Sequence, residues 1–170
     1  MLIVFGGLPG TGKTTLSKRI SKKHKACYLR IDVIEQALRN SGRLQAEIYD
    51  AGYVAALAIA DSNLPLGINV VVDAVNPVES VRNAWRNLAE KYKTMFVAVE
   101  IICSDVDEHK RRVESRKIDI PGLNATTWQQ VIEREYEPWL SNHIVVDTYK
   151  FEINECLKKI DNSIRGVDIK

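Results

Sequence analysis

The sequence predicts an α/β protein in which a parallel sheet is covered by helices on both faces. Short apolar runs rich in branched residues alternate along the chain with longer segments of helical spacing, which is the pattern of such a sheet. The 170 residues, of which 45% are hydrophobic, suit a single substantial core. No repeat, low-complexity stretch or linker divides them, so we expect one domain over residues 1–170.

Five apolar runs are the expected strands, because each is short and rich in β-branched residues. They cover residues 2–5, 26–31, 68–72, 96–103 and 144–146. Five strands are enough for one sheet.

Two segments show helical spacing clearly, and we expect both stripes in the core. The first follows Asn76-Pro77, a cap and first-turn proline, and contains Val81, Trp85, Leu88 and Tyr92. The second contains Ile153, Leu157, Ile160 and Ile164. Small residues between positions 48 and 59 predict another, closely packed helix, which residues 64–67 end.

Charge and cysteine content say little about a partner. The net charge of +2 is too small to indicate a nucleic-acid or membrane partner through long-range electrostatics. The three cysteines are odd in number and lack metal-ligand spacing, so we expect buried, reduced thiols. There is no basic-then-apolar leader and no apolar run near the roughly 20 residues of a membrane span, so we expect a cytoplasmic location. We also expect a monomer or weak dimer.

The most specific motif is Gly7-Leu8-Pro9-Gly10-Thr11-Gly12-Lys13-Thr14, which satisfies the P-loop pattern G-x-x-x-x-G-K-[ST]. It lies directly after an expected strand and before a helical segment, as the pattern requires. Glycines allow successive N–H groups to point at phosphates, and the start of the following helix adds to the attraction. We therefore expect ATP as a ligand, with contacts from Gly7, Leu8, Pro9, Gly10, Thr11, Gly12, Lys13, Thr14 and Thr15.

Within this motif, Lys13 is expected to reach the β- and γ-phosphates, and the Thr14 hydroxyl is expected to bind Mg²⁺. The third expected strand leads into Asp73, which is able to hold Mg²⁺ directly or through water. Ala74 follows where a hydrolytic ATPase usually has glutamate, and neither D-x-x-G there nor N-K-x-D, both typical of GTPases, is present. Transfer to an acceptor hydroxyl is then favoured, and it needs a carboxylate and cations near the phosphates.

Asp32 is the candidate general base, because it ends the second apolar run and precedes a helical segment. Strand ends of a parallel sheet converge on the ligand crevice. The alternative is that Asp32 caps the helix, and one residue is able to do both. Arg30 and Arg39 are weaker candidates, as surface or acceptor contacts.

The charged segment 108–116 supplies candidate cations. Arg112 and Arg116 are four residues apart and are expected to share one helix face. A lid over approximately residues 111–127 would hold them above the phosphates and exclude water. The alternative to a lid is a charged helix exposed to solvent, and we favour this interpretation for Lys110 and Arg111.

The acceptor site is expected near the carboxyl ends of the second and third strands. Its candidate residues form a polar set suited to a hydroxyl-bearing molecule: Asp32, Glu35, Arg39, Asn76 and Arg82. Three later aromatic residues are able to line such a pocket or to belong to the core: Trp128, Tyr136 and Trp139.

Together, the P-loop, residues 28–32, residues 72–74 and the Arg112/Arg116 pair resemble the zeta-toxin-like and polynucleotide-kinase-like small AAA-type P-loop kinases. This group includes relatives of chloramphenicol phosphotransferase, gluconate kinase and adenylylsulfate kinase, and residues 126–139 extend the resemblance over nearly the whole chain. The resemblance implies a three-layer α/β/α P-loop NTPase fold with sheet order 2-3-1-4-5. It also implies that Asp32 is the base, that the lid arginines touch ATP phosphates, and that Thr148 and Tyr149 lie at the adenine.

Three functions remain open. The leading one is an ATP-dependent phosphotransferase acting on a hydroxyl of a small molecule, with Lys13, Arg112 and Arg116 stabilising the transferred phosphate. A polynucleotide 5′-hydroxyl kinase is the second, although it would need a basic groove that the balanced charge does not predict. A non-catalytic ATP-binding regulatory module is the third.

Overall fold

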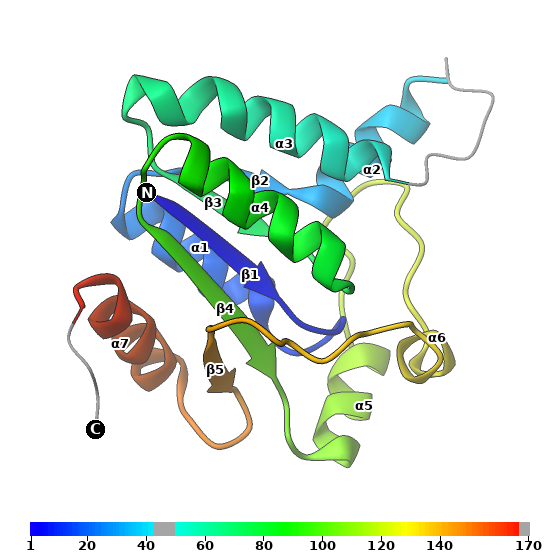
Figure 1. Cartoon of the computed structure of the whole chain (residues 1–170). Coiled ribbons are helices and arrows are strands. Elements are labelled where there is room, and N and C mark those ends of the chain that lie inside the picture. The colour runs from blue at the N-terminus through cyan, green and yellow to red at the C-terminus, as the bar shows by residue number, and fades with distance from the viewer. Residues whose placement is uncertain (43–49, 167–170) are drawn as a thin grey trace.

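The computed structural model contains a five-stranded, fully parallel sheet (Figure 1) and describes residues 1–42 and 50–166. The strands are β1 (Leu2–Gly6), β2 (Cys27–Arg30), β3 (Val70–Asp73), β4 (Phe96–Ile102) and β5 (Ile144–Asp147). They pair in the order β2-β3-β1-β4-β5. This arrangement confirms the predicted α/β class and the sheet order implied by the resemblance.

Helices connect the strands and cover both faces of the sheet. They are α1 (Lys13–Lys23), α2 (Ile31–Asn40), α3 (Ala51–Asn63), α4 (Glu79–Lys91), α5 (Val106–Glu114), α6 (Trp128–Ile132) and α7 (Ile153–Ile164), with a 3₁₀ turn, η1 (Leu64–Leu66). Figure 1 shows α3 and α4 in front of the sheet and α1 behind it.

The core is divided in two by the sheet, because successive side chains of a strand point to opposite faces. Leu2 and Val4 of β1 pack on one side with Trp85 of α4. Ile3 and Phe5 pack on the other side with α1 and α7. Burial on both faces explains why the strands read as continuous apolar runs.

The predicted helical stripes are confirmed with one exception. Trp85 and Leu88 of α4 are buried, as are Ile160 and Ile164 of α7, but Ile153 in the first turn of α7 is exposed. The small-residue helix begins at Ala51 as α3, while position 48 lies outside the described residues. A Cβ on Gly52 would lie 2.4 Å from Glu35 Cγ, so close packing of α3 on α2 accounts for the small residues.

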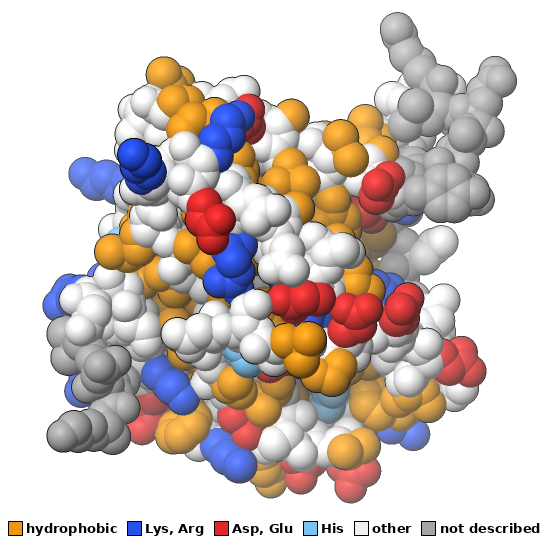
Figure 2. Space-filling model, in the orientation of Figure 1, with side chains coloured by type: hydrophobic (Ala, Val, Ile, Leu, Met, Phe, Trp, Pro, Cys, Tyr) orange, Lys and Arg blue, Asp and Glu red, His pale blue; other side chains and the backbone are white. Residues whose placement is uncertain are grey.

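Other sequence expectations concern the surface and the thiols. All three cysteines are unpaired, with Cys156 buried and the other two partly buried. No helix in the described ranges is long and apolar enough to span a membrane. Acidic and basic side chains are interspersed on the face drawn in Figure 2.

Candidate functional site

The P-loop joins the end of β1 to the start of α1 and depends on glycine at two positions. Gly7 has φ of +129°, and a Cβ there would lie 2.1 Å from the carbonyl oxygen of Ile101. Gly12, directly before α1, has φ of +98°. Both values lie in the region that side chains with a Cβ rarely adopt. The loop therefore curls around the first turn of α1, where backbone N–H groups attract anions.

Helix α5 supports the P-loop from one side. The buried His109 ring has Nε2 2.7 Å from the Pro9 carbonyl oxygen, and since a carbonyl only accepts, Nε2 is the donor. The same ring packs edge-on against Trp128 of α6, with centroids 5.2 Å apart. A Cβ on Gly10 would lie 2.5 Å from Val113 Cγ2. In the sequence, His109 lies in a charged segment that gives no indication of this contact.

Lys13 lies at the centre of the charged groups of the site. Its Nζ is buried and donates to the Leu8 carbonyl oxygen at 2.8 Å. Burial lowers the pKa of Lys13 to about 8, although Asp73 and Asp32 act in the opposite direction. Two arginines, Arg116 and Arg134, are near enough to lower this pKa further.

A cavity of about 250 Å³ lies directly over the P-loop. It is lined by Gly10, Gly12, Lys13, Thr14, Thr15, Arg112, Ser115 and Arg116. The expected shared helix face of the arginine pair is wrong, because α5 ends at Glu114 and Arg116 lies beyond it. Both arginines nevertheless border this cavity. Among the described residues, the side chain of Arg116 has no hydrogen bond or ion pair.

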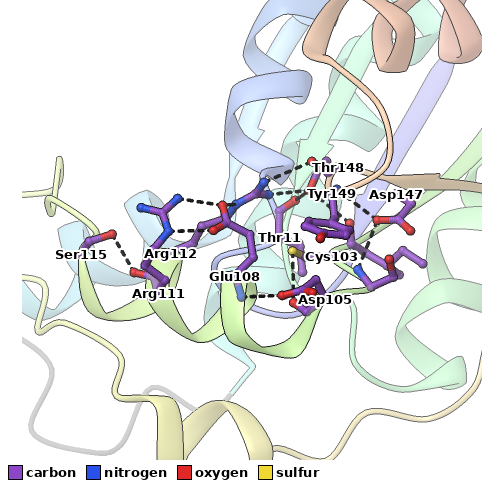
Figure 3. Close-up of polar contacts among 12 residues, drawn as sticks. Thr11, Cys103, Asp105, Glu108, Arg111, Arg112, Ser115, Asp147, Thr148 and Tyr149 are labelled. Atoms are coloured by element: carbon purple, nitrogen blue, oxygen red, sulfur yellow. Dashed lines mark hydrogen bonds and ion pairs between the residues drawn. The ribbon is translucent and has the colours of Figure 1, made fainter.

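Arg112 is fully engaged within the protein (Figure 3). Its Nε donates to Glu108 Oε1 at 2.7 Å, while Nη1 and Nη2 donate to the hydroxyl and carbonyl oxygens of Thr148 at 2.8 and 3.1 Å. The Thr148 hydroxyl in turn donates to the Thr11 carbonyl oxygen at 2.8 Å. Arg112 thus connects α5, the turn after β5 and the P-loop.

A second cavity, of about 310 Å³, shares Arg112 and part of the P-loop with the first. Its lining combines P-loop backbone with apolar side chains and comprises Gly10, Gly12, Thr15, Leu16, Arg112, Thr148, Phe151, Ile153 and Cys156. This composition suits a flat heterocycle. Thr148 lines this cavity, whereas Tyr149 is more than half exposed and does not. Neither Phe151 nor Ile153 was predicted to line a cavity. The helical stripe assigned Ile153 to the core, and Phe151 belongs to no motif.

Asp32 lies in the first turn of α2 with a side chain that is 43% exposed. Arg30 occupies the N-cap position and no side-chain cap bond is present, so the capping alternative is wrong. The nearest charged atom is Arg30 Nε, 3.8 Å from Asp32 Oδ2. An accessible carboxylate without a hydrogen bond from the described residues is available to accept a proton.

Asp73, at the end of β3, is buried and partly paired. The Tyr28 hydroxyl donates to its Oδ2 at 2.6 Å, and burial followed by the charge of Asp73 raises the pKa of Tyr28. No cluster of three or more acidic, His or Cys side chains able to hold a metal occurs within residues 1–42 and 50–166. Mg²⁺ commonly takes one or two protein oxygens and completes its shell with phosphates and water. Thr14 and Asp73 fit that limited role.

The acceptor candidates on α2 lie close together. Glu35 Oε2 is 3.7 Å from Arg39 Nη2, and burial raises the pKa of Glu35, against the opposing effect of Arg39. Asp32 and Arg134 also act on the pKa of Glu35, so the charges of the three residues share one region. Arg134 borders an open cavity of about 530 Å³ with Asn124, Ala125, Thr126, Gln130 and Glu133. Arg134 belongs to none of the motifs in the sequence, so its position near this cavity was not predicted.

Asn76 and Arg82 have their polar atoms directed into the protein. Asn76 is fully buried, donates to the Phe5 carbonyl oxygen at 2.7 Å and accepts from Trp85 Nε1 at 3.1 Å. Arg82, only 3% exposed, donates to the Glu79 carboxylate at 3.2 Å and to the carbonyl oxygens of Asn76, Pro77, Glu137 and Pro138. These positions do not support the predicted acceptor contacts.

The late aromatic residues also serve packing. The Arg82 guanidinium lies over the rings of Tyr136 and Trp139, 5.3 and 4.6 Å from their centroids. A Cβ on Gly6 would lie 2.2 Å from Trp139 Cζ2, so this ring covers the end of β1. Of the two alternatives, core packing describes Tyr136 and Trp139.

Similar proteins are found among curated sequences and solved structures. An adenylyl-sulfate kinase from Synechococcus sp. (strain JA-3-3Ab) is 25% identical over 173 residues, which cover 95% of this chain and 92% of that protein. An L-seryl-tRNA(Sec) kinase from Methanococcus maripaludis is 31% identical over 180 residues, covering 94% of this chain but 64% of that protein. Kti12 from Chaetomium thermophilum, solved with ADP-AlF3, has a TM-score of 0.72 at 18% identity, with both chains fully covered.

The solved structure shows likeness of fold, and the curated relatives are kinases by name. Residues 2–136, well over half of the chain, match the family described as an AAA domain. The chain therefore belongs to the AAA domain family, in its group of P-loop kinases.

Proposed function

We propose that the protein is an ATP-dependent phosphotransferase that moves the γ-phosphoryl group onto a hydroxyl of a small polar acceptor. One observation carries this proposal: the buried Lys13 and the arginines Arg112 and Arg116 line one cavity over the P-loop, and the carboxylates of Asp32 and Asp73 act on the charge of Lys13. A site for phosphoryl transfer needs such cations and a nearby carboxylate at the phosphates. The kinase relatives support the same reaction class.

In this proposal the nucleotide spans the two cavities that meet at Arg112. The base occupies the partly apolar cavity beside Phe151, and the phosphates lie over the P-loop. Thr14 and Asp73 would hold Mg²⁺, and the bound metal would neutralise phosphate charge. Arg112, already bonded to Thr148, forms the wall between the base and the phosphates.

In the transfer step, the acceptor oxygen forms a bond to the γ-phosphorus as the bond to the ADP oxygen breaks. The acceptor's proton passes to Asp32, whose carboxylate is accessible. Lys13, Arg116 and Arg134 stabilise the charge of the transferred group. The acceptor enters from the open cavity beside Arg134, near Glu35 and Arg39.

A second candidate acceptor is a hydroxyl carried by a nucleic acid. The observation that favours it is the 31% identity to an L-seryl-tRNA(Sec) kinase. Against it, charges of both signs are interspersed on the face in Figure 2, and an extended basic groove is not visible there. A binding module without chemistry is the remaining alternative.

The test combines nucleotide binding with an acceptor screen. Wild type is expected to bind ADP·Mg²⁺ in calorimetry, and Lys13→Ala is expected to lose that binding, because it removes the buried cation of the P-loop. Sugars, hydroxy acids, aminoglycosides, adenosine 5′-phosphosulfate and a short 5′-hydroxyl oligonucleotide would then be tested for acceptor-dependent ADP release. Absence of nucleotide binding by wild type would reject the proposal, and release only with the oligonucleotide would favour the second candidate.

A further inference from the structure

Arg30 is a buried cation whose partners come from three different elements. Its side chain, at the end of β2, is 3% exposed, and Nη1 donates to both carboxylate oxygens of Asp119 at 3.0 and 2.8 Å. Nε lies 3.8 Å from Asp32 Oδ2 and 3.9 Å from Asp73 Oδ2, too far for hydrogen bonds. Within the described ranges, Nε and Nη2 are buried without a hydrogen-bond partner. Arg30 is therefore shared unequally between Asp119 and the two carboxylates of the site.

Asp119 belongs to residues 115–127, which join α5 to α6 and are named the docking loop here. In Figure 1 this segment leaves α5, reaches α2 and returns to α6. Lys18 of α1 also donates to Asp119, at 3.1 Å, and Asn40 of α2 donates to the Pro121 carbonyl oxygen at 3.3 Å. Arg30, and after it Lys18, holds the pKa of Asp119 well below its ordinary value. The loop is thus attached to the sheet and to two helices through an ionised carboxylate.

The docking loop also carries a residue of the phosphate cavity. Arg116 borders that cavity at the start of the loop, three residues before Asp119. Because Arg116 has no partner of its own among the described residues, the attachment of Asp119 limits where its guanidinium lies. The Asp119–Arg30 ion pair is therefore connected to two groups of the proposed site. It limits the position of Arg116 through the backbone of the loop, and it lies next to Asp32 through Arg30.

We propose that the Asp119–Arg30 pair docks the loop over the phosphate cavity. Arg30 is a positioning residue that exchanges its ion-pair partner between Asp119 and the carboxylates of Asp32 and Asp73. With the loop docked, Asp119 holds Arg30 and the carboxylate of Asp32 is free for the acceptor's proton. With the loop undocked, the buried guanidinium loses its hydrogen-bonded partner, and a buried charge requires another. The two nearest carboxylates, at 3.8 and 3.9 Å, replace it.

This exchange makes transfer depend on docking. When Arg30 bonds to Asp32, the base is occupied, and Arg116 is no longer held over the phosphates. The inference rests on the proposed function, because it uses Asp32 as the base. In this inference Asp119 and Lys18 attach the loop and Arg30 exchanges partners, and none of these three residues belongs to the P-loop or the arginine pair.

Asp119→Asn is the primary test, because this side chain is 46% exposed and its substitution does not open the core. Amide hydrogen exchange of residues 115–127 is expected to speed up about tenfold or more, as expected when an ion pair to a buried group is broken. In acceptor-dependent ADP release, kcat is expected to fall by about tenfold, while the Kd for ADP·Mg²⁺ stays within about threefold. Asp119→Glu is expected to restore part of kcat, since it keeps the charge.

Asp107→Asn is the matched control, because Asp107 is exposed on α5 and its side chain makes no hydrogen bond or ion pair within the described residues. It is expected to leave exchange and kcat unchanged. Wild-type exchange in Asp119→Asn would overturn the docking contact, and faster exchange with unchanged kcat would overturn the positioning role of Arg30. If wild type itself neither binds ADP nor transfers phosphate, the proposed function fails first; if it does both, only this inference is at stake.

Discussion

The single residue Lys13 carries a buried positive charge that favours the binding of an anion. Its ammonium group is buried with a single carbonyl partner, and its pKa falls to about 8. A protonated amine in this position lacks the water that would normally solvate it. Bound phosphates supply the missing charge, so binding and protonation of Lys13 are linked.

This linkage predicts the pH dependence of nucleotide binding. Phosphates favour the ammonium form, so the pKa of Lys13 in the complex lies above about 8, its value in the free protein. Affinity is therefore full below pH 8 and falls as pH rises through and above it, by up to about tenfold per pH unit. Calorimetry with ADP·Mg²⁺ between about pH 7 and about pH 9.5 measures this slope. A constant Kd for wild type over this range would contradict the predicted linkage.

Arg134 is the second residue whose role can be tested alone. Its side chain has no hydrogen bond or ion pair within the part of the chain described, yet it lowers the pKa of Lys13. Arg134→Gln is expected to lower kcat about 10- to 100-fold through lost charge stabilisation. Thermal stability should stay near wild type, because no folded-state partner is lost. Arg19→Gln, at an exposed position of α1, is the control, and equal activity of the two variants would exclude Arg134 from the site.

At the scale of elements, α5 is the support on which the P-loop rests. Its His109 donates to the Pro9 carbonyl oxygen and packs on Trp128, while its Arg112 bonds to Thr148. One helix therefore fixes the loop conformation and the turn that borders the base cavity. Changes in α5 should affect nucleotide binding even where they do not touch the nucleotide.

His109→Ala tests this support. It leaves the Pro9 carbonyl without its buried donor, so the free energy of unfolding should fall by about 1–3 kcal/mol in urea denaturation. Affinity for ADP·Mg²⁺ should fall as well, because the P-loop loses a fixed contact. His109→Gln keeps a donor and is expected to recover part of both losses. Unchanged stability and affinity in His109→Ala would show that the contact is dispensable.

The elements themselves were largely predictable, because buried parallel strands and amphipathic helices have distinct periods. All five strands formed, with boundaries shifted by one or two residues; the second ends at Arg30 because Ile31 begins α2. The early end of α5 was not predictable from charge spacing. Glu114, Ser115 and Arg116 continue the polar pattern, whereas the structure turns at Ser115, whose hydroxyl donates to the Arg111 carbonyl oxygen at 2.7 Å.

At the scale of the whole molecule, Arg82 joins distant parts of the chain. Residues 136–139 lie against the start of α4 and the end of β1 because Arg82 bonds to their carbonyls and stacks on their aromatic rings. Arg82→Gln should therefore lower the free energy of unfolding by about 3–5 kcal/mol, as for a buried charge network that loses one member. Urea denaturation measures this loss. A variant of wild-type stability with weakened acceptor binding would instead restore Arg82 to the acceptor site.

The site was predictable where local sequence determines geometry and unpredictable where tertiary contacts do. The P-loop, Asp32 and Asp73 follow from strand ends of a parallel sheet. Asn76 and Arg82 follow a strand end too, but Asn76 bonds back to Phe5 of β1, and the carbonyls that bind Arg82 lie more than 50 residues away in sequence. Arg134 and Phe151 carry no local motif at all. Arg134 stands out only because its charge acts on that of Lys13, and Phe151 only because it lines a cavity together with Thr148.

We infer that this P-loop transfers phosphate to an acceptor through Asp32. The most direct test is a paired measurement on Asp32→Asn, with the Kd for ADP·Mg²⁺ and the kcat for ADP release with the best acceptor from the screen. For Asp32→Asn we expect a Kd within about threefold of wild type and a kcat at least about 100-fold lower, because only the proton acceptor is lost. Equal turnover by Asp32→Asn and wild type would contradict this inference.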